Sequence, residues 1–171
     1  MESIKSIDEL IELLKKKNAN DSYLDIMQSI DIPIGEFEKY YSWKRDGYTR
    51  NCLTKTDDFE LLLICYEKGQ ETPIHDFDAK QTWIHTLQGK LCEERFRVSE
   101  DGSSLEQLSS MTLGTNDYSF MSKVGIHRYK NVYEARTVSL NLYCKPIEHW
   151  TQYDENAQRT DVKVGHDSVY V

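Results

Sequence analysis

The sequence predicts a mainly β protein: an antiparallel sandwich or barrel preceded by an N-terminal cap of about three helices. From Tyr48 onward, short runs rich in leucine, isoleucine, valine, tyrosine and threonine alternate with turn residues, as is typical of such sheets. Before Tyr48, apolar residues recur at helical spacing. At 171 residues we expect one domain, with the helical cap over 1–45 and the barrel over 46–171.

The first helix is expected to begin after Ser6, whose side chain can form a capping box with Glu9. Its apolar face has residues three or four apart, namely Ile7, Leu10, Ile11 and Leu14. Lysines at 15–17 suit the negative end of the helix dipole. Two shorter helices are expected at about 21–29 and 34–41.

Strands are expected where β-branched, leucine and aromatic residues cluster between turns. Examples of these runs are 60–66, 81–87, 91–98, 118–121, 138–142 and the tail after residue 161. The turn clusters that separate them lie at 67–69, 88–90, 99–104 and 114–117. Many short strands at this spacing indicate an antiparallel architecture.

The net charge and the amino-acid composition exclude several classes of binding partner. The 29 acidic residues outnumber the 21 basic ones, which gives a net charge of −8 and argues against nucleic-acid binding. No apolar run approaches the roughly 20 residues of a membrane span, and the first residues lack a signal-peptide layout. We therefore expect a cytoplasmic protein, no membrane partner and a monomer. The four cysteines form no C-x-x-C pair, so we expect them to be buried free thiols.

Two histidines are the first candidate metal ligands. His75 and His127 each lie beside a turn at the start of a predicted strand, and neutral imidazole is a common ligand for iron, zinc, nickel and copper. The alternative is that each is a hydrogen-bonded core histidine. Strand alternation places His85 on the opposite face from Ile84, away from the interior unless a bulge reverses it. The remaining two histidines, at 149 and 166, lie in polar surroundings and are expected to be exposed.

Two further segments carry chemistry. In Tyr48-Thr49-Arg50-Asn51, the arginine can bind a substrate carboxylate through two hydrogen bonds, or it can form a structural ion pair. Further along, Ser139, Asn141 and Tyr143 share one face of a predicted strand. Such a polar face either meets water or lines a polar cavity.

Taken together, these segments resemble the cysteine dioxygenase family of the cupin superfamily over nearly the whole chain. The first cupin motif has two histidines one residue apart, then a glutamate and a glycine. The chain has this spacing at His75, Phe77, Thr82 and Gly89. The second motif is similar to Gly125, His127 and Asn131. The family's substrate-binding Tyr-Thr-Arg-Asn is unchanged at 48–51, and its Ser-x-His-x-Tyr strand appears at 139–143.

The resemblance implies a cupin jelly-roll barrel that holds Fe(II) and adds O2 to the sulfur of cysteine or a similar small thiol, giving a sulfinate. It implies that His75 and His127 are metal ligands and that Arg50, with Tyr48, binds the substrate carboxylate. It also implies that Tyr143 is the catalytic group, supported by the Ser139 and Asn141 positions of its strand.

The chain departs from the family at three positions. Phe77 stands where the third histidine ligand is expected and cannot bind a metal. Asp78 and His85 are candidate replacements, although alternation places both out of phase with His75. Thr82 replaces the cysteine that cross-links to the tyrosine in animal members, and Asn141 replaces a histidine. The alternative function is therefore a catalytically degenerate cupin that binds a small amino-acid-like ligand with weak or no metal binding.

Overall fold

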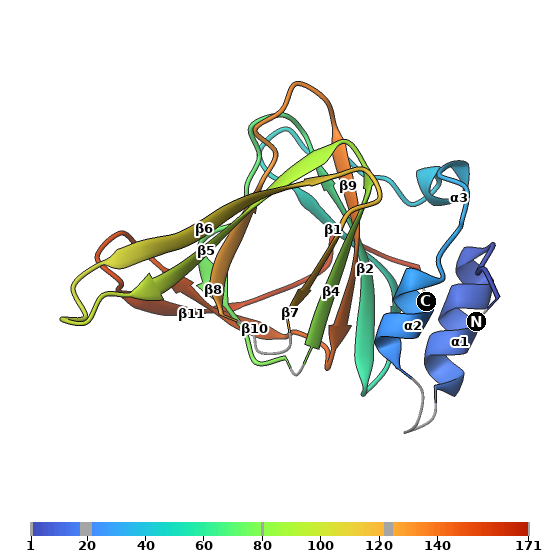
Figure 1. Cartoon of the computed structure of the whole chain (residues 1–171), viewed down its shortest axis with the longest axis horizontal. Coiled ribbons are helices and arrows are strands. Elements are labelled where there is room, and N and C mark those ends of the chain that lie inside the picture. Colours follow the sequence, from blue (N-terminus) through green and yellow to red (C-terminus); the bar gives the residue numbers. More distant parts are fainter. Residues whose placement is uncertain (1, 18–21, 80, 122–124, 171) are drawn as a thin grey trace. The chain divides into compact units, whose positions relative to one another are not determined.

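The computed structural model describes residues 2–17, 22–79, 81–121 and 125–170 and divides into two compact units, 1–41 and 42–171. The first unit is helical and the second is a β structure (Figure 1). The first compact unit ends at residue 41, four residues before the expected end of the helical cap. That the whole chain is one domain stays a prediction.

The helical unit contains α1 (Ile7–Lys16), α2 (Tyr23–Gln28) and α3 (Gly35–Glu38). The predicted cap of α1 is confirmed, because the Ser6 hydroxyl accepts a hydrogen bond from the Glu9 amide at 3.2 Å. The Glu9 carboxylate reaches one residue further back than a capping box requires and accepts the Lys5 amide at 2.9 Å. The third helix is shorter than the predicted 34–41. Part of the predicted 21–29 helix lies outside the described residues.

The second unit consists of two six-stranded sheets that face each other (Figure 1). The strand order in the first sheet is β12 (Ser168–Val169), β1 (Thr49–Lys55), β2 (Phe59–Tyr66), β9 (Thr137–Cys144), β4 (Gln81–Gln88) and β7 (Tyr118–Met121). In the second it is β11 (Arg159–Lys163), β10 (His149–Tyr153), β3 (His75–Asp76), β8 (Ile126–Lys130), β5 (Lys90–Val98) and β6 (Leu105–Gly114). The predicted mainly β class is confirmed.

In the part of the chain that the structure describes, all strand pairs in the two sheets are antiparallel except one. The short β12 lies parallel to β1, with Asn51 opposite Ser168 and Cys52 opposite Val169. This pairing brings the C-terminal segment of the chain against β1, which carries the Tyr-Thr-Arg-Asn segment. The predicted tail strand therefore has a definite partner.

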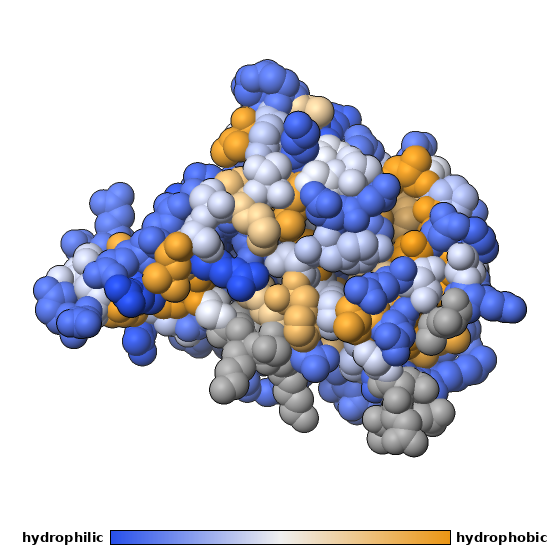
Figure 2. All heavy atoms as spheres, in the orientation of Figure 1, coloured by the Kyte–Doolittle hydropathy of each residue, from blue (hydrophilic) through white to orange (hydrophobic). Residues whose placement is uncertain are grey.

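The inner faces of the two sheets enclose one hydrophobic core. Its buried members include Cys52, Leu62, Ile64, Tyr66, Phe77, Ile84, Leu91, Tyr129, Tyr143 and Trp150. Alternation selects these residues, since Leu62, Ile64 and Tyr66 are two apart on β2. The visible surface of this unit is mainly hydrophilic, with small hydrophobic groups scattered over it (Figure 2). Polar side chains buried within this apolar core therefore mark a candidate functional site.

The turn between β4 and β5 depends on a glycine. Gly89 has φ of +78°, and a Cβ added there would lie 2.6 Å from the Arg136 carbonyl oxygen and 2.7 Å from Thr137 Oγ1. Gly69 has a similar φ of +81° but has no such neighbour within 4 Å. The two glycines therefore separate the cost of a left-handed backbone from the cost of a clash.

We expect Gly89→Ala to lower the free energy of unfolding by about 3 kcal/mol, because it adds a steric clash to backbone strain. Gly69→Ala should cost about 1 kcal/mol from strain alone. Urea denaturation of both variants measures the difference. Equal losses would contradict the close approach of the 136–137 backbone to Gly89.

Candidate functional site

The two candidate metal ligands face each other across neighbouring strands. His75 on β3 is directly opposite His127 on β8, and their ring centroids are 4.5 Å apart. The two residues are 3% and 1% exposed, so both rings lie in the interior of the barrel. The structure thus brings together residues that are 52 positions apart in the sequence.

Both imidazoles are held in one tautomer by the chain just before them. His75 Nδ1 is 2.8 Å from the Pro73 carbonyl oxygen, and His127 Nδ1 is 2.7 Å from that of Gly125. A carbonyl oxygen can only accept, so each Nδ1 must donate and each neutral ring keeps its lone pair on Nε2. Burial lowers the pKa of both histidines, well below the usual value for His75, whose pKa the neighbouring His127 lowers further. Neutral rings with Nδ1 bonded to a carbonyl are the form that binds metals through Nε2.

The position of the expected third ligand is apolar. The Phe77 ring lies 5.7 Å from the His75 ring, 5.4 Å from the His127 ring and 5.4 Å from the Tyr143 ring. It packs into the core and is 7% exposed. Phe77 therefore occupies the space between the histidine pair and the tyrosine without offering a donor atom.

Neither candidate replacement ligand lies in this space. The Asp78 side chain is 92% exposed and forms an ion pair with Lys145 at 2.8 Å. His85 is buried on the outer side of β4, where it stacks on Tyr118 with ring centroids 4.1 Å apart, while the neighbouring Ile84 lines the interior cavity. Both positions agree with strand alternation, which places Asp78 and His85 out of phase with His75. Among the described residues, the histidine pair is part of no cluster of three His, Cys, Asp or Glu ligands.

Arg50 is buried beside the histidines and is braced from two directions. Its Nε donates to the Gly165 carbonyl at 3.2 Å, and its backbone exchanges hydrogen bonds with Asp167. The guanidinium carbon lies 5.5 Å from the Trp150 ring and 6.0 Å from the Tyr143 ring. Its Nη2 is buried without a hydrogen-bond partner among the described residues. A buried cation with a free donor is suited to bind an anion.

Ser139, Asn141 and Tyr143 form a hydrogen-bonded row on the inner face of β9. The Ser139 hydroxyl donates to Asn141 Oδ1 at 2.7 Å, and Asn141 Nδ2 donates to the Tyr143 oxygen at 3.2 Å. Burial raises the pKa of Tyr143, an effect that the Arg50 charge opposes. The phenol is therefore protonated at neutral pH. Because Asn141 already donates to its oxygen, Tyr143 can donate its own proton into the cavity.

These side chains line one small cavity inside the barrel. The lining includes Tyr48, Arg50, His75, Phe77, His127, Asn141, Tyr143 and Trp150. Its volume of about 10 Å³ admits roughly one water molecule. Phe77 and Trp150 also line a surface depression of about 410 Å³, so these two rings form the wall between the cavity and the outside.

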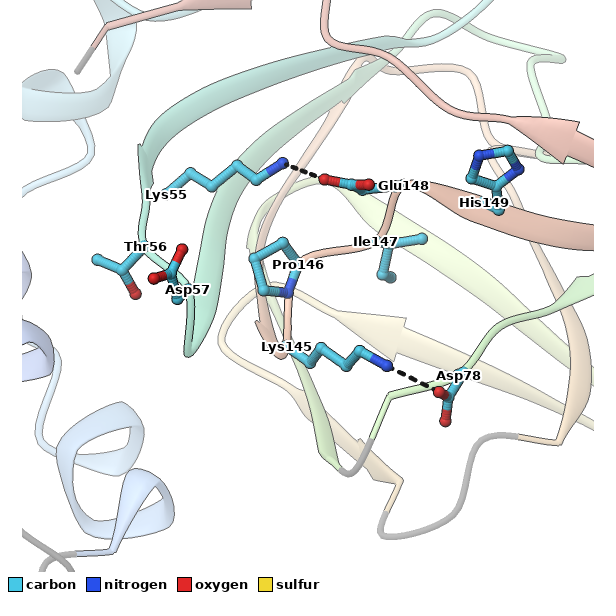
Figure 3. A pocket seen from close by; sticks show the side chains of 9 residues that line it. All are labelled: Lys55, Thr56, Asp57, Asp78, Lys145, Pro146, Ile147, Glu148 and His149. Atoms are coloured by element: carbon cyan, nitrogen blue, oxygen red, sulfur yellow. Dashed lines mark hydrogen bonds and ion pairs between the residues drawn. The ribbon is translucent and has the colours of Figure 1, made fainter.

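A different groove, of about 400 Å³, is crossed by two ion pairs (Figure 3). Lys55 reaches Glu148 at 3.5 Å, and Lys145 reaches Asp78 at 2.8 Å. Apart from Asp78, none of the predicted site residues lines this groove. Its size alone does not make it the functional site, since four of its charged side chains are already joined in these two ion pairs.

The structure corrects one expectation and adds one residue. His149 is exposed as expected, with 54% of its side chain accessible. The expectation for His166 is wrong: its side chain is only 18% exposed and is bonded to the fully buried Glu60, because the pairing of β12 with β1 draws this segment inward. Trp150, which sequence reasoning did not select, lines the cavity. Strand alternation, which places Trp150 on the opposite face of β10 from His149, could have identified it. All four cysteines are buried, as expected, and none forms a disulfide bond among the described residues.

Comparison with known proteins matches most of the chain to one family. A family model described as "Cysteine dioxygenase type I" matches residues 2–156. Cysteine dioxygenase type 1 proteins of Rattus norvegicus and Homo sapiens are 26% identical over 160 residues, covering 88% of this chain and 80% of theirs. These relatives support an oxygenase enzyme.

Solved structures support the fold. A Klebsiella pneumoniae protein with a double-stranded β-helix domain has a TM-score of 0.53 at 10% identity, covering 86% of this chain and 93% of its own. Oxalate decarboxylase of Bacillus subtilis has a TM-score of 0.51 at 13% identity, over 75% of this chain and 31% of that enzyme. No helix among the described residues is long and apolar enough to cross a membrane.

The buried His85 predicts an acid-sensitive fold. Burial lowers its pKa from 6.5 to about 4, whereas in the unfolded chain its pKa is about 6.5. Between these values the unfolded state binds more protons, so stability is present above about pH 6.5 and falls as the pH decreases towards 4. Between pH 7 and pH 5 this residue should cost about 2 kcal/mol.

Urea denaturation at both pH values should therefore show a flatter pH dependence in His85→Gln than in the wild type. His149→Gln, at an exposed position, serves as the control and should keep the wild-type dependence. A His85→Gln profile that is as steep as the wild type would contradict the burial of this ring.

Proposed function

Because the chain belongs to the cysteine dioxygenase type I family, we propose that it oxidises cysteine or a similar small thiol to a sulfinate with O2. The observation that carries this proposal is one cavity that holds two neutral imidazoles and a buried guanidinium with a free donor. A cavity of this kind suits a substrate that carries both a metal-binding group and a carboxylate. A small thiol amino acid has both.

The donor set fits Fe(II) in part. His75 and His127 would hold the metal through Nε2, the nitrogen that their backbone hydrogen bonds leave free. Phe77 contributes nothing, so the thiolate and amine of the substrate are needed to add further ligands. When bound, the iron would bring the thiol and O2 together on one centre and supply the redox chemistry.

Arg50 would bind the carboxylate of the substrate. Its Nε is engaged by the Gly165 carbonyl, which fixes the plane of the guanidinium and leaves Nη2 to donate. The flanking rings of Trp150 and Tyr143 restrict its motion and exclude water. An arginine held in this way has little side-chain entropy left to lose when the substrate binds.

Tyr143 would hold a proton at the position where the substrate reacts. Its raised pKa keeps the phenol neutral, and Asn141 orients its oxygen as an acceptor. The hydroxyl hydrogen would then be available for donation to a substrate atom in the cavity. Unlike a histidine, Asn141 does not titrate near neutral pH, so this row keeps its direction across the physiological range.

The cavity must enlarge before a thiol amino acid can enter, since its volume of about 10 Å³ is that of roughly one water. Phe77 and Trp150 separate the cavity from the surface depression. A change of rotamer at Phe77 would connect the two and also free the space next to the histidine pair. Phe77, which replaces a metal ligand of the family, would then also control access of the substrate to the cavity.

The same phenylalanine favours a second candidate function. A ring packed against both histidines disfavours a metal there, which would leave a cupin that binds a small amino acid through Arg50 without oxidising it. The two functions differ in their need for iron and O2. Both require the Arg50 site.

We expect iron-loaded protein to consume O2 when cysteine or a related thiol is added and to form the sulfinate, measured with an oxygen electrode and mass spectrometry. Arg50→Gln should lower kcat/KM by about 100-fold, because it removes a charged hydrogen bond worth about 2–3 kcal/mol. Arg97→Gln changes an exposed arginine paired with Glu106 and should have no effect.

Absence of O2 consumption with every small thiol tested would overturn the dioxygenase proposal. Phe77→His, compared with Phe77→Leu, then identifies the cause. Gain of iron binding and activity in the histidine variant alone would favour the degenerate binder, whose metal site was lost at this position.

A further inference from the structure

A second group of metal-ligating side chains lies outside the cavity described above. Cys52 Sγ, one carboxylate oxygen of Glu60 and a ring nitrogen of His166 lie within 4.8 Å of one another. Among the described residues this is the group of three His, Cys, Asp or Glu side chains that meets this distance. None of the three lines the cavity of the histidine pair.

Three separate segments place these side chains together. Cys52 lies opposite Leu62 in the pairing of β1 with β2, and Glu60 is two residues from Leu62 on the same inward face. His166 precedes β12. The segment is fixed because the Asp167 amide donates to the Arg50 carbonyl at 2.8 Å, and the Arg50 amide donates to the Asp167 carboxylate at 2.7 Å.

Glu60 is the unusual member of the group. Its side chain is fully buried, and it accepts the Ile147 amide at 3.1 Å and contacts the His166 ring. A buried carboxylate is costly unless it is paired or coordinates a metal. The His166 contact alone would serve as a structural ion pair, but it does not account for the thiol that faces the same carboxylate.

We propose that Cys52, Glu60 and His166 form a site for a divalent transition metal of the zinc class. Thiolate sulfur, imidazole nitrogen and carboxylate oxygen are the three donor types that Zn²⁺ uses, at about 2.0–2.3 Å. Tetrahedral ligands at those lengths are about 3.3–3.7 Å apart. Small side-chain rotations bring atoms within 4.8 Å of one another to that spacing.

Binding would release a proton. Burial and the Glu60 charge raise the pKa of Cys52 to about 11, so its thiol is protonated in the metal-free protein. The metal replaces that proton, which leaves to solvent. Affinity should therefore decrease as the pH is lowered.

The site would also act on Arg50. The Gly165 carbonyl, which accepts the Arg50 side chain, immediately precedes His166 in the chain. A metal that holds His166 would hold this brace as well. Three protein ligands leave a fourth tetrahedral position for water or another ligand.

The test is a titration of the reduced full-length protein with Co²⁺, a spectroscopic substitute for Zn²⁺. We expect about one equivalent to produce a near-ultraviolet band of thiolate-to-cobalt charge transfer, which excess Zn²⁺ abolishes. Cys52→Ser should remove the band, and His166→Gln should weaken binding by at least about 100-fold. Cys65→Ser changes a buried cysteine on the opposite face of β2 and should leave the band unchanged.

The outcome also separates this site from the histidine pair. His127→Gln should keep the band, since His127 is not one of the three ligands. No thiolate band in the wild type, or a band that survives Cys52→Ser, would overturn the proposal. If Cys52→Ser does not fold, retention of full affinity in His166→Gln would overturn it equally, and thiol oxidation can fail or succeed independently of both results.

Discussion

The pairing of β3 with β8 is the constraint on which the functional interior depends. It places His75 directly opposite His127, and the residues just before each histidine supply the carbonyl that fixes its tautomer. Both rings are neutral because burial disfavours the charged form. A shift of one residue in this register would turn one histidine out of the interior and leave the buried Arg50 beside a single imidazole instead of a pair.

Phe77 adds hydrophobic packing beside the two histidines and removes a metal ligand from the same space. Its ring contacts both histidines and Tyr143, so it continues the hydrophobic core into a position where a polar ligand would otherwise stand. This packing closes the cavity to about 10 Å³. Any activity of the site therefore requires that part of the core yields when the substrate enters, and the wall that Phe77 shares with Trp150 is the place where it can do so.

The sequence predicted the elements whose pattern is local. The Ser6 cap follows from the spacing of Ser6 and Glu9, and the strands β2, β4 and β9 follow from their apolar and β-branched residues. Alternation alone turned His85 away from the interior. Strand β6 was missed because seven of its ten residues are exposed and it shows no apolar alternation. The environment of His166 depends on a parallel pairing between distant segments, which leaves no local signal. Cavity volume likewise results from packing of the whole interior.

The most direct test of iron binding by His75 and His127 is the position of iron in crystals of the iron-loaded protein, located by anomalous scattering at the iron absorption edge. We expect a peak at bonding distance from Nε2 of both His75 and His127, beside the Arg50 guanidinium. Iron-loaded crystals with no peak between the two histidines would contradict it. The buried pair would then be part of the core alone, and the family's chemistry would be absent from this chain.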